Sequence, residues 1–205
     1  MKNIAVFASG GGTDFQSVID ANEREKFCVI KYLIASKEGI GAIERAKKAG
    51  IPAAVFAKKD YSSLEELYDS LSALLEGAEV DYIVLAGWLK IIPPSFIARF
   101  RDRIINIHPS LIPAFCGAGY YGLKVHEAAL SYGVKVSGAT VHFVEAEVDG
   151  GAIIMQRAVP VLDGDTPELL QKRVLETEHE MLPLCVKLLC EGKIEKEGRQ
   201  VHIRA

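Results

Sequence analysis

An amide and an imidazole stand two residues apart in an apolar stretch near the middle of the chain. Asn106 and His108 alternate with isoleucines, so on a β-strand both polar side chains point to the same side. Pro109 ends the strand, because proline has no backbone N–H to donate. Such a pair could stabilise an oxyanion and exchange a proton near neutral pH. The alternative is a pair of hydrogen-bonded core residues, but the end of a parallel strand favours a ligand site.

A second polar group follows about thirty residues later. Thr140 and His142 fall on one face of an alternating stretch, and Asp149 comes next in an Asp-Gly-Gly sequence. A carboxylate near His108 would favour the protonated imidazole as charge develops, and Asp149 is the candidate. The alternative is ordinary turn chemistry, since Asp-Gly is a common turn pair.

A glycine-rich turn lies near the N-terminus, between an apolar run and a helix expected from about Phe15 to Ala21. A helix N-terminus offers free N–H groups and a partial positive charge, and glycines let a ligand approach the backbone, so a phosphate is the expected occupant. The dinucleotide fingerprint is incomplete because Phe15 replaces its third glycine, and the P-loop lysine is missing. A plain strand-to-helix turn is the alternative.

The elements that must position these residues alternate between strand and helix. The pattern predicts an α/β fold: a Rossmann-like open, mostly parallel twisted sheet with helices on both faces, then a long C-terminal helix and a hairpin. We expect a single domain, 1–205, with halves at about 1–100 and 101–205. The expected strands are 4–8, 27–35, 53–56, 82–86, 104–108, 137–144 and 153–161; the expected helices are 15–21, 40–49, 63–76, 94–100, 125–132 and 167–190, with a hairpin at 193–204.

Two segments beside these strands have the composition of ligand-binding loops. Residues 114–123 carry three glycines and three aromatic residues, which suits a mobile lid over the strand ends. Trp88 follows the strand at 82–86, where it could wall a pocket for a flat ligand or pack in the core.

Composition narrows the function classes. The chain has 205 residues, of which 49% are hydrophobic and 25% charged, and a net charge of −3 gives no general attraction to nucleic acid or anionic membrane. Neither a signal peptide nor an apolar run of membrane-spanning length is visible. The four cysteines show no metal-binding spacing, so we expect reduced thiols, Cys116 in the loop among them, in a cytoplasmic protein.

Several motifs together carry a family resemblance. The glycine turn, Leu85-Ala86-Gly87-Trp88, the run from Asn106 to Pro113, the run from Thr140 to Val144 and Asp149-Gly150-Gly151 follow one another as in phosphoribosylglycinamide formyltransferases of purine synthesis. The chain resembles this folate-dependent family over nearly its whole length. The resemblance implies metal-independent transfer of a formyl group from 10-formyltetrahydrofolate to the amine of glycinamide ribonucleotide, by a monomer or a homodimer.

The resemblance also implies site residues, at positions that match the family's motifs. Asp14 stands where an Asn is usual, and we expect its carboxylate to turn away from the phosphate as the helix N-cap. Lys90 stands where an Arg is common, which leaves a point charge for the folate tail. The implied residues are Asn106, His108 and Asp149 for catalysis, with Thr140 and His142 lining the site; Gly12, Thr13 and Asp14 for the phosphate; Glu178 for the glycinamide end; and Leu89, Lys90, Ile91, Ile92 and Gly150 for the folate.

Four rival functions remain to be compared. A formyltetrahydrofolate deformylase would use the same chemistry but usually carries an extra N-terminal domain. A methionyl-tRNA formyltransferase needs a C-terminal domain, and an acidic chain is poorly suited to bind tRNA. A nicotinamide oxidoreductase is disfavoured by the incomplete glycine fingerprint. A non-catalytic nucleotide-phosphate binding module would leave Asn106, His108 and Asp149 without a purpose.

Overall fold

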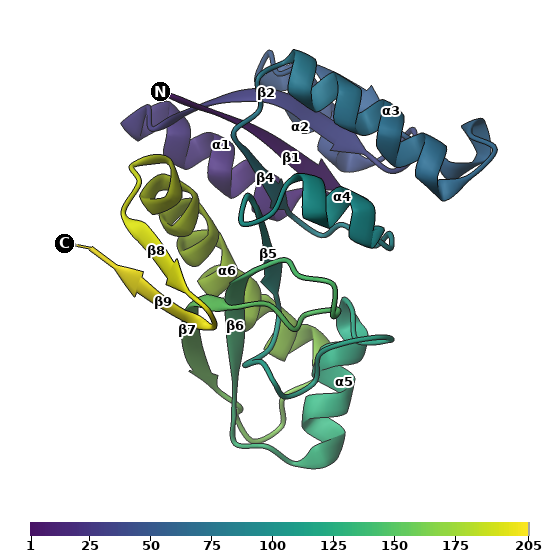
Figure 1. Cartoon of the computed structure of the whole chain (residues 1–205). Helices are drawn as coiled ribbons and strands as arrows, with labels where there is room; N and C mark the ends of the chain where they lie inside the picture. Colours follow the sequence, from purple (N-terminus) through teal and green to yellow (C-terminus); the bar gives the residue numbers. More distant parts are fainter. Residues whose placement is uncertain (205) are drawn as a thin grey trace. The chain divides into compact units, whose positions relative to one another are not determined.

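The computed structural model describes residues 1–204 and is drawn in Figure 1. The chain forms two compact units, Met1–Ile105 and a second that begins at Asn106. The strand that carries the central polar pair runs through this division, since β5 spans Ile104–His108. The single-domain organisation stays a prediction, and each unit is described by itself.

The first unit is built on parallel strands in the order β3-β2-β1-β4, with β5 beginning beside β4. Residues 4–8 of β1 have no exposed surface, so both faces of this strand are covered. The strands are β1 (Lys2–Ala8), β2 (Cys28–Ala35), β3 (Ala53–Val55) and β4 (Tyr82–Leu85), and the helices are α1 (Thr13–Glu25), α2 (Gly41–Lys48), the 3₁₀ turn η1 (Lys58–Asp60), α3 (Leu64–Gly77) and α4 (Pro94–Arg99).

Local sequence explains where the helices of this unit begin. The hydroxyl of Ser63 caps α3 by accepting the N–H of Glu66 at 3.0 Å, and the Glu66 carboxylate accepts the N–H of Ser62 at 2.8 Å. Proline occupies the first position of α4, where its missing N–H costs nothing.

Trp88 belongs to the core of the first unit. Its ring meets the edge of Phe7 at 5.1 Å between centroids, and its indole N–H donates to the hydroxyl of Tyr68 at 3.2 Å. Of the two interpretations left open by the sequence, core packing is therefore the correct one.

The second unit continues the sheet in the order β5-β6-β7, with β6 and β7 antiparallel. The long helix α6 packs on both of these strands and against α5 (Figure 1). Its bounds agree with the prediction, because Thr166 caps the helix and proline fills its first position. The remaining elements are α5 (Leu123–Tyr132), β6 (Val136–Phe143), β7 (Ile153–Pro160), α6 (Pro167–Cys190), β8 (Ile194–Glu197) and β9 (Gln200–Ile203).

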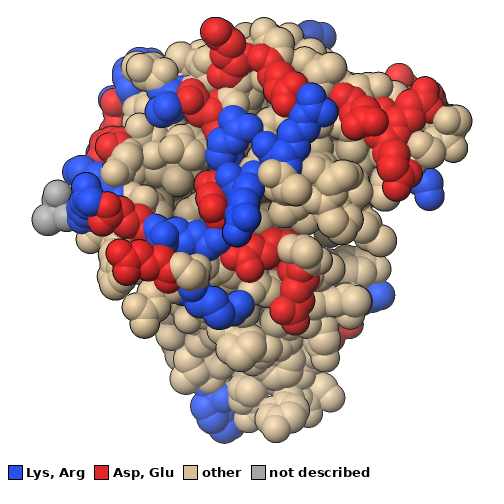
Figure 2. Space-filling model, in the orientation of Figure 1, with Lys and Arg blue, Asp and Glu red and all other residues tan. Residues whose placement is uncertain are grey.

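The predicted fold class is confirmed: seven strands form one mostly parallel sheet with covered faces, followed by the long helix and an antiparallel hairpin. Across residues 1–204, no helix has both the length and the hydropathy needed to span a membrane. Acidic and basic side chains are interspersed on the face shown in Figure 2.

Candidate active site

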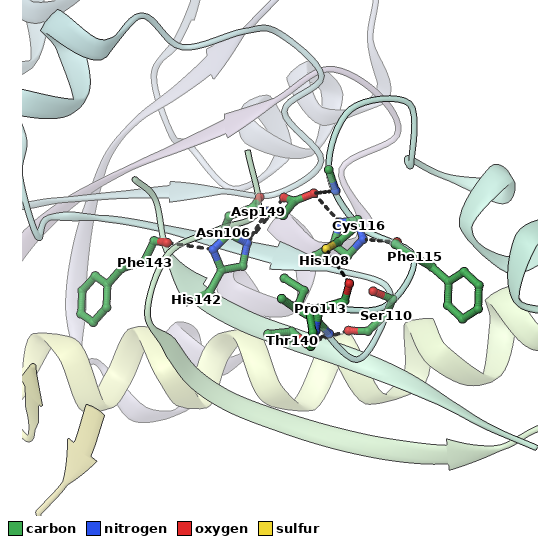
Figure 3. A network of polar contacts seen from close by, with 12 residues as sticks. Asn106, His108, Ser110, Pro113, Phe115, Cys116, Thr140, His142, Phe143 and Asp149 are labelled. Atoms are coloured by element: carbon green, nitrogen blue, oxygen red, sulfur yellow. Dashed lines mark hydrogen bonds and ion pairs between the residues drawn. The ribbon is translucent and has the colours of Figure 1, made fainter. Parts of the chain in front are cut away.

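Four polar side chains converge beyond the end of β5, as Figure 3 shows. Asn106 and His108 come from β5, His142 comes from β6, and Asp149 comes from the turn between β6 and β7. Three of them are nearly removed from solvent, since the side chains of His108, His142 and Asp149 are 6%, 2% and 11% exposed. Two strands and one turn therefore bring the predicted catalytic residues and His142 into one cluster.

His108 has a protein partner on each ring nitrogen. Its Nε2 lies 2.9 Å from the carbonyl oxygen of Phe115, which can only accept, so this nitrogen carries the proton. Its Nδ1 faces a carboxylate oxygen of Asp149 at 3.5 Å. Burial lowers the pKa of His108, and the charge of Asp149 opposes this only in part, so the imidazole is neutral at pH 7.

Asn106 and His142 form a hydrogen-bonded pair. The Nδ1 of His142 is 2.8 Å from the carbonyl oxygen of Phe143 and therefore donates to it. Its Nε2 is then an acceptor, and the amide nitrogen of Asn106 donates to it at 3.1 Å. The same Nε2 lies 3.7 Å from Asp149. This arrangement fixes the Asn106 amide with its NH₂ toward the cluster.

Asp149 is an ionised carboxylate that accepts one main-chain hydrogen bond and lies beside two histidines. Burial works against its charge, but the side chain of His142, the proximity of His108 and the N–H of Gly117, which donates at 2.8 Å, together keep the pKa of Asp149 below its usual value. Its backbone lies in the left-handed region at φ 54°, which is uncommon for a residue other than glycine. The turn thus places a charged carboxylate between two buried histidines at some conformational cost.

Thr140 supports the cluster indirectly, because its hydroxyl bonds to the chain that follows β5. Its hydroxyl is fully buried, donates to the carbonyl of Ser110 at 2.6 Å and accepts the N–H of Ile112 at 3.1 Å. Gln156 donates to the same hydroxyl at 3.0 Å and to the carbonyl of Ile112 at 2.9 Å. These bonds fix the chain directly after β5, and no pattern in the sequence points to Gln156 as one of the residues that make them.

The loop at 114–123 is tied to the cluster at its start. The carbonyl of Phe115 and the N–H of Gly117 are the groups that contact His108 and Asp149. The ring of Phe115 packs edge-on against Tyr120 and Tyr132, at 6.4 and 5.9 Å between centroids. Main-chain groups of this kind leave no mark in the side-chain pattern, which is why the sequence did not reveal them.

The glycine turn of the first unit has the form of an anion site. Gly12 is the N-cap of α1 with a left-handed backbone at φ 73°, and a Cβ on it would lie 2.7 Å from the Cβ of Ala42. The guanidinium of Arg45 donates to the carbonyl of Gly11 at 2.8 Å and to the side chain of Gln16 at 3.1 Å. The first N–H groups of α1 have no acceptor within the helix, and Arg45 places a positive charge beside them.

The prediction that Asp14 is the helix N-cap is wrong. Because Gly12 adopts the left-handed conformation, α1 begins at Thr13, and Asp14 is the second residue of the helix, not its cap. Burial raises the pKa of the Asp14 carboxyl to about 6, so part of the population carries a proton near neutral pH.

The predicted folate segment of the first unit exposes apolar side chains. Leu89 is 59% exposed and Ile91 is 77% exposed. The backbone of this segment is anchored, because the N–H of Leu89 donates to the hydroxyl of Ser9 at 3.0 Å and the carbonyl of Ile91 accepts that of Tyr68 at 3.0 Å. An anchored backbone with exposed apolar groups suits a flat heterocycle.

Glu178 lies on α6 in the second unit and is 6% exposed, so its side chain is buried and does not lie on a solvated face of the helix. Among the residues that the structure describes, no three His, Cys, Asp or Glu side chains are grouped to hold a metal ion.

Known proteins similar to this chain indicate its family. The family model described as formyl transferase matches residues 2–186. The chain belongs to the formyl transferase family. It is 42% identical over 204 residues to the phosphoribosylglycinamide formyltransferase of Haemophilus influenzae, a match that covers 99% of this chain and 94% of that protein.

Two further members of the family extend this comparison. The chloroplastic phosphoribosylglycinamide formyltransferase of Vigna unguiculata is 43% identical over 204 residues, which span 64% of its length. The glycinamide ribonucleotide transformylase 1 of Symbiobacterium toebii has a crystal structure that superposes with a TM-score of 0.94 at 39% identity, covering 100% of this chain and 95% of that one.

Proposed function

We propose that this protein transfers the formyl group of 10-formyltetrahydrofolate to the amine of glycinamide ribonucleotide. The observation that carries the proposal is the cluster of Asn106, His108 and His142 around the ionised Asp149, in a chain whose relatives of near-equal length are phosphoribosylglycinamide formyltransferases. Such a cluster contains both hydrogen-bond donors and a proton acceptor, which are the two things that amine attack on a formyl carbon requires.

The donors serve the oxygen of the formyl group. When the amine attacks, the C=O double bond opens and the oxygen becomes negative. Asn106 uses one N–H for His142 and has a second for this oxyanion. His108 donates its Nε2–H to the carbonyl of Phe115, so the formyl oxygen receives this hydrogen bond when it replaces that carbonyl. The loop at 114–123 must therefore shift at Phe115 for the reaction.

The carboxylate serves the proton. The attacking amine loses a proton, and the leaving N10 of the folate gains one when the bond from carbon to N10 breaks. Asp149 is the base for this proton transfer, because its lowered pKa keeps its carboxylate ionised at neutral pH. Its charge also favours a proton on His108 as the oxyanion forms.

The first unit supplies the groups for the phosphate and the pterin. The phosphate of the ribonucleotide binds at Gly12, Thr13 and Asp14, where the N–H groups of the first turn of α1 and the charge of Arg45 attract an anion. The pterin lies against Leu89 to Ile92, and in the second unit Gly150 and Glu178 meet the folate and the glycinamide end. No metal ion takes part.

The rate of 10-formyltetrahydrofolate deformylation, followed optically with a chelator present, tests the proposal. We expect turnover that requires glycinamide ribonucleotide and ignores the chelator. Equal turnover without the ribonucleotide would identify a hydrolase instead, and the absence of turnover under both conditions would favour a phosphate-binding module.

A further inference from the structure

The turn that carries Asp149 does not hold its shape by local contacts alone. Asp149 has a left-handed backbone, and two main-chain bonds close the turn around it: the N–H of Gly150 donates to the carbonyl of Glu147 at 3.1 Å, and at the base the N–H of Phe143 donates to the carbonyl of Ala152 at 2.9 Å. Gly151 is pressed so closely on β6 that a Cβ there would lie 1.8 Å from the carbonyl oxygen of Phe143. A conformation of this kind persists when neighbouring structure enforces it.

The C-terminal hairpin β8–β9 contacts both ends of this turn. Its two strands pair from Ile194 with Ile203 to Glu197 with Gln200, which puts Arg199 in the tip. Arg199 donates from Nη1 to the carbonyl of Gly150 at 2.9 Å, directly after Asp149. Figure 1 shows the hairpin beside β7, and the two elements are in contact.

Lys196 makes the second contact, at the other end of the turn. Its ammonium lies 3.0 Å from the carboxylate of Glu145 and 5.7 Å from the centre of the Phe143 ring. The Lys196 side chain is 17% exposed, so this charge is partly shielded from solvent. The hairpin therefore contacts the turn on both sides of Asp149: Lys196 binds before it and Arg199 binds after it.

We propose that the hairpin β8–β9 positions the carboxylate of Asp149, with Arg199 and Lys196 as the residues that transmit this control. Both act through the turn and neither touches substrate. The proposal rests on the function proposed above, because it concerns the carboxylate assigned there as the proton acceptor. It gives the last residues of the chain a share in the rate of the reaction.

Steady-state kinetics of Arg199→Ala, Lys196→Ala and the double variant form the first part of the test. A small displacement of a catalytic group lowers turnover steeply, so we expect kcat to fall about threefold in each single variant and about tenfold or more in the double, with KM for the ribonucleotide little changed. Arg204→Ala is the matched control, since Arg204 pairs with Glu195 inside the hairpin; it should keep wild-type kcat.

A double-mutant cycle with Asp149→Asn then asks whether the two residues act through the carboxylate. If they do, the Arg199→Ala and Lys196→Ala pair costs almost nothing in the Asp149→Asn background, because the group that it positions is already lost. The same tenfold loss in both backgrounds would overturn the proposal, as would unchanged kcat in the double variant.

Titration of His108 by NMR provides a readout that needs no turnover. The charge of Asp149 supports the pKa of His108, so the double variant should titrate at lower pH than the wild type, whereas Arg204→Ala should not. An unchanged titration would contradict positioning by the hairpin. If the wild-type protein transferred no formyl group, the proposed function would fail, and this titration would still decide the role of the hairpin.

Discussion

At the scale of single residues, the state of each titrating group follows from its neighbours. Asp149 and His108 are both buried, yet their pKa values are lowered for different reasons. For His108, burial itself disfavours the charged form, whereas for Asp149 the neighbouring histidines and the N–H of Gly117 outweigh burial. The result at pH 7 is an ionised carboxylate beside a neutral imidazole, which is the state that a proton acceptor with an adjacent hydrogen-bond donor requires.

Truncation of either residue should remove most of the activity. We expect His108→Ala and Asp149→Ala each to lower kcat by roughly 100- to 1000-fold, the usual cost of losing one oxyanion or proton-transfer group. Circular dichroism and thermal melting should show that the fold persists. Near-native turnover in either folded variant would refute the assignment.

Asp14 should make phosphate binding depend on pH. Above pH 6 its carboxyl loses the proton, and the resulting charge repels a phosphate dianion at the start of α1 by about 1 kcal/mol, which corresponds to roughly fivefold in affinity. Asp14→Asn should therefore lower KM for the ribonucleotide at pH 8. At pH 5.5, where Asp14 is protonated, the two proteins should have similar KM values. A large rise in KM for Asp14→Asn at pH 8 would mean that the carboxylate itself contacts the substrate.

The sequence predicted the side chains of the cluster better than the backbone groups around them. Asn106 and His108 were predictable because strand periodicity and Pro109 determine where they point and where the strand ends. The carbonyl of Phe115 and the N–H of Gly117 were not, because any residue supplies such groups and only the path of the loop brings them near.

At the scale of elements, the hydroxyl of Thr140 couples β6 to the chain after β5. Thr140→Val keeps the shape but leaves the N–H of Ile112 and the carbonyl of Ser110 without this partner in the core. We expect a loss of about 1–3 kcal/mol in the free energy of unfolding, measured in urea. Thr140→Ser keeps the hydroxyl and should lose less. Equal stability of the valine variant and the wild type would show that these bonds contribute nothing.

Element boundaries were predictable wherever a cap was visible in the sequence. Thr166 followed by proline placed the start of α6, and Ser63 placed that of α3. The start of α1 was missed by two residues because Gly12 caps it through a left-handed backbone rather than through a side chain. The sequence alone does not show which glycine in a run of three takes the left-handed conformation.

At the scale of the whole molecule, buried histidines should make the fold sensitive to acid. His126 on α5 is 1% exposed, and its burial lowers its pKa from 6.5 to about 4. Because this pKa is lowered in the folded state, the folded protein takes up the proton at a lower pH than the unfolded chain does. The contribution of neutral His126 to the free energy of unfolding is therefore fully present above pH 6.5 and is lost as the pH falls from 6.5 toward 4.

His126→Gln should flatten this pH dependence. Between pH 7 and pH 4.5 we expect the wild type to lose on the order of 2 kcal/mol more stability than the variant, measured by denaturant unfolding at each pH. His202→Gln, on the exposed strand β9, is the control and should follow the wild type. The same pH dependence in His126→Gln and the wild type would show that His126 is not responsible.

We propose that the cluster around Asp149 transfers a formyl group between two small molecules. The most direct measurement is the fate of an isotopically labelled formyl carbon supplied on 10-formyltetrahydrofolate, with glycinamide ribonucleotide present in excess. We expect the label to be recovered on the amine of the ribonucleotide, one for each folate consumed, and we expect Asp149→Ala to lose this transfer. Recovery of the label as formate, or equal transfer by Asp149→Ala, would contradict it.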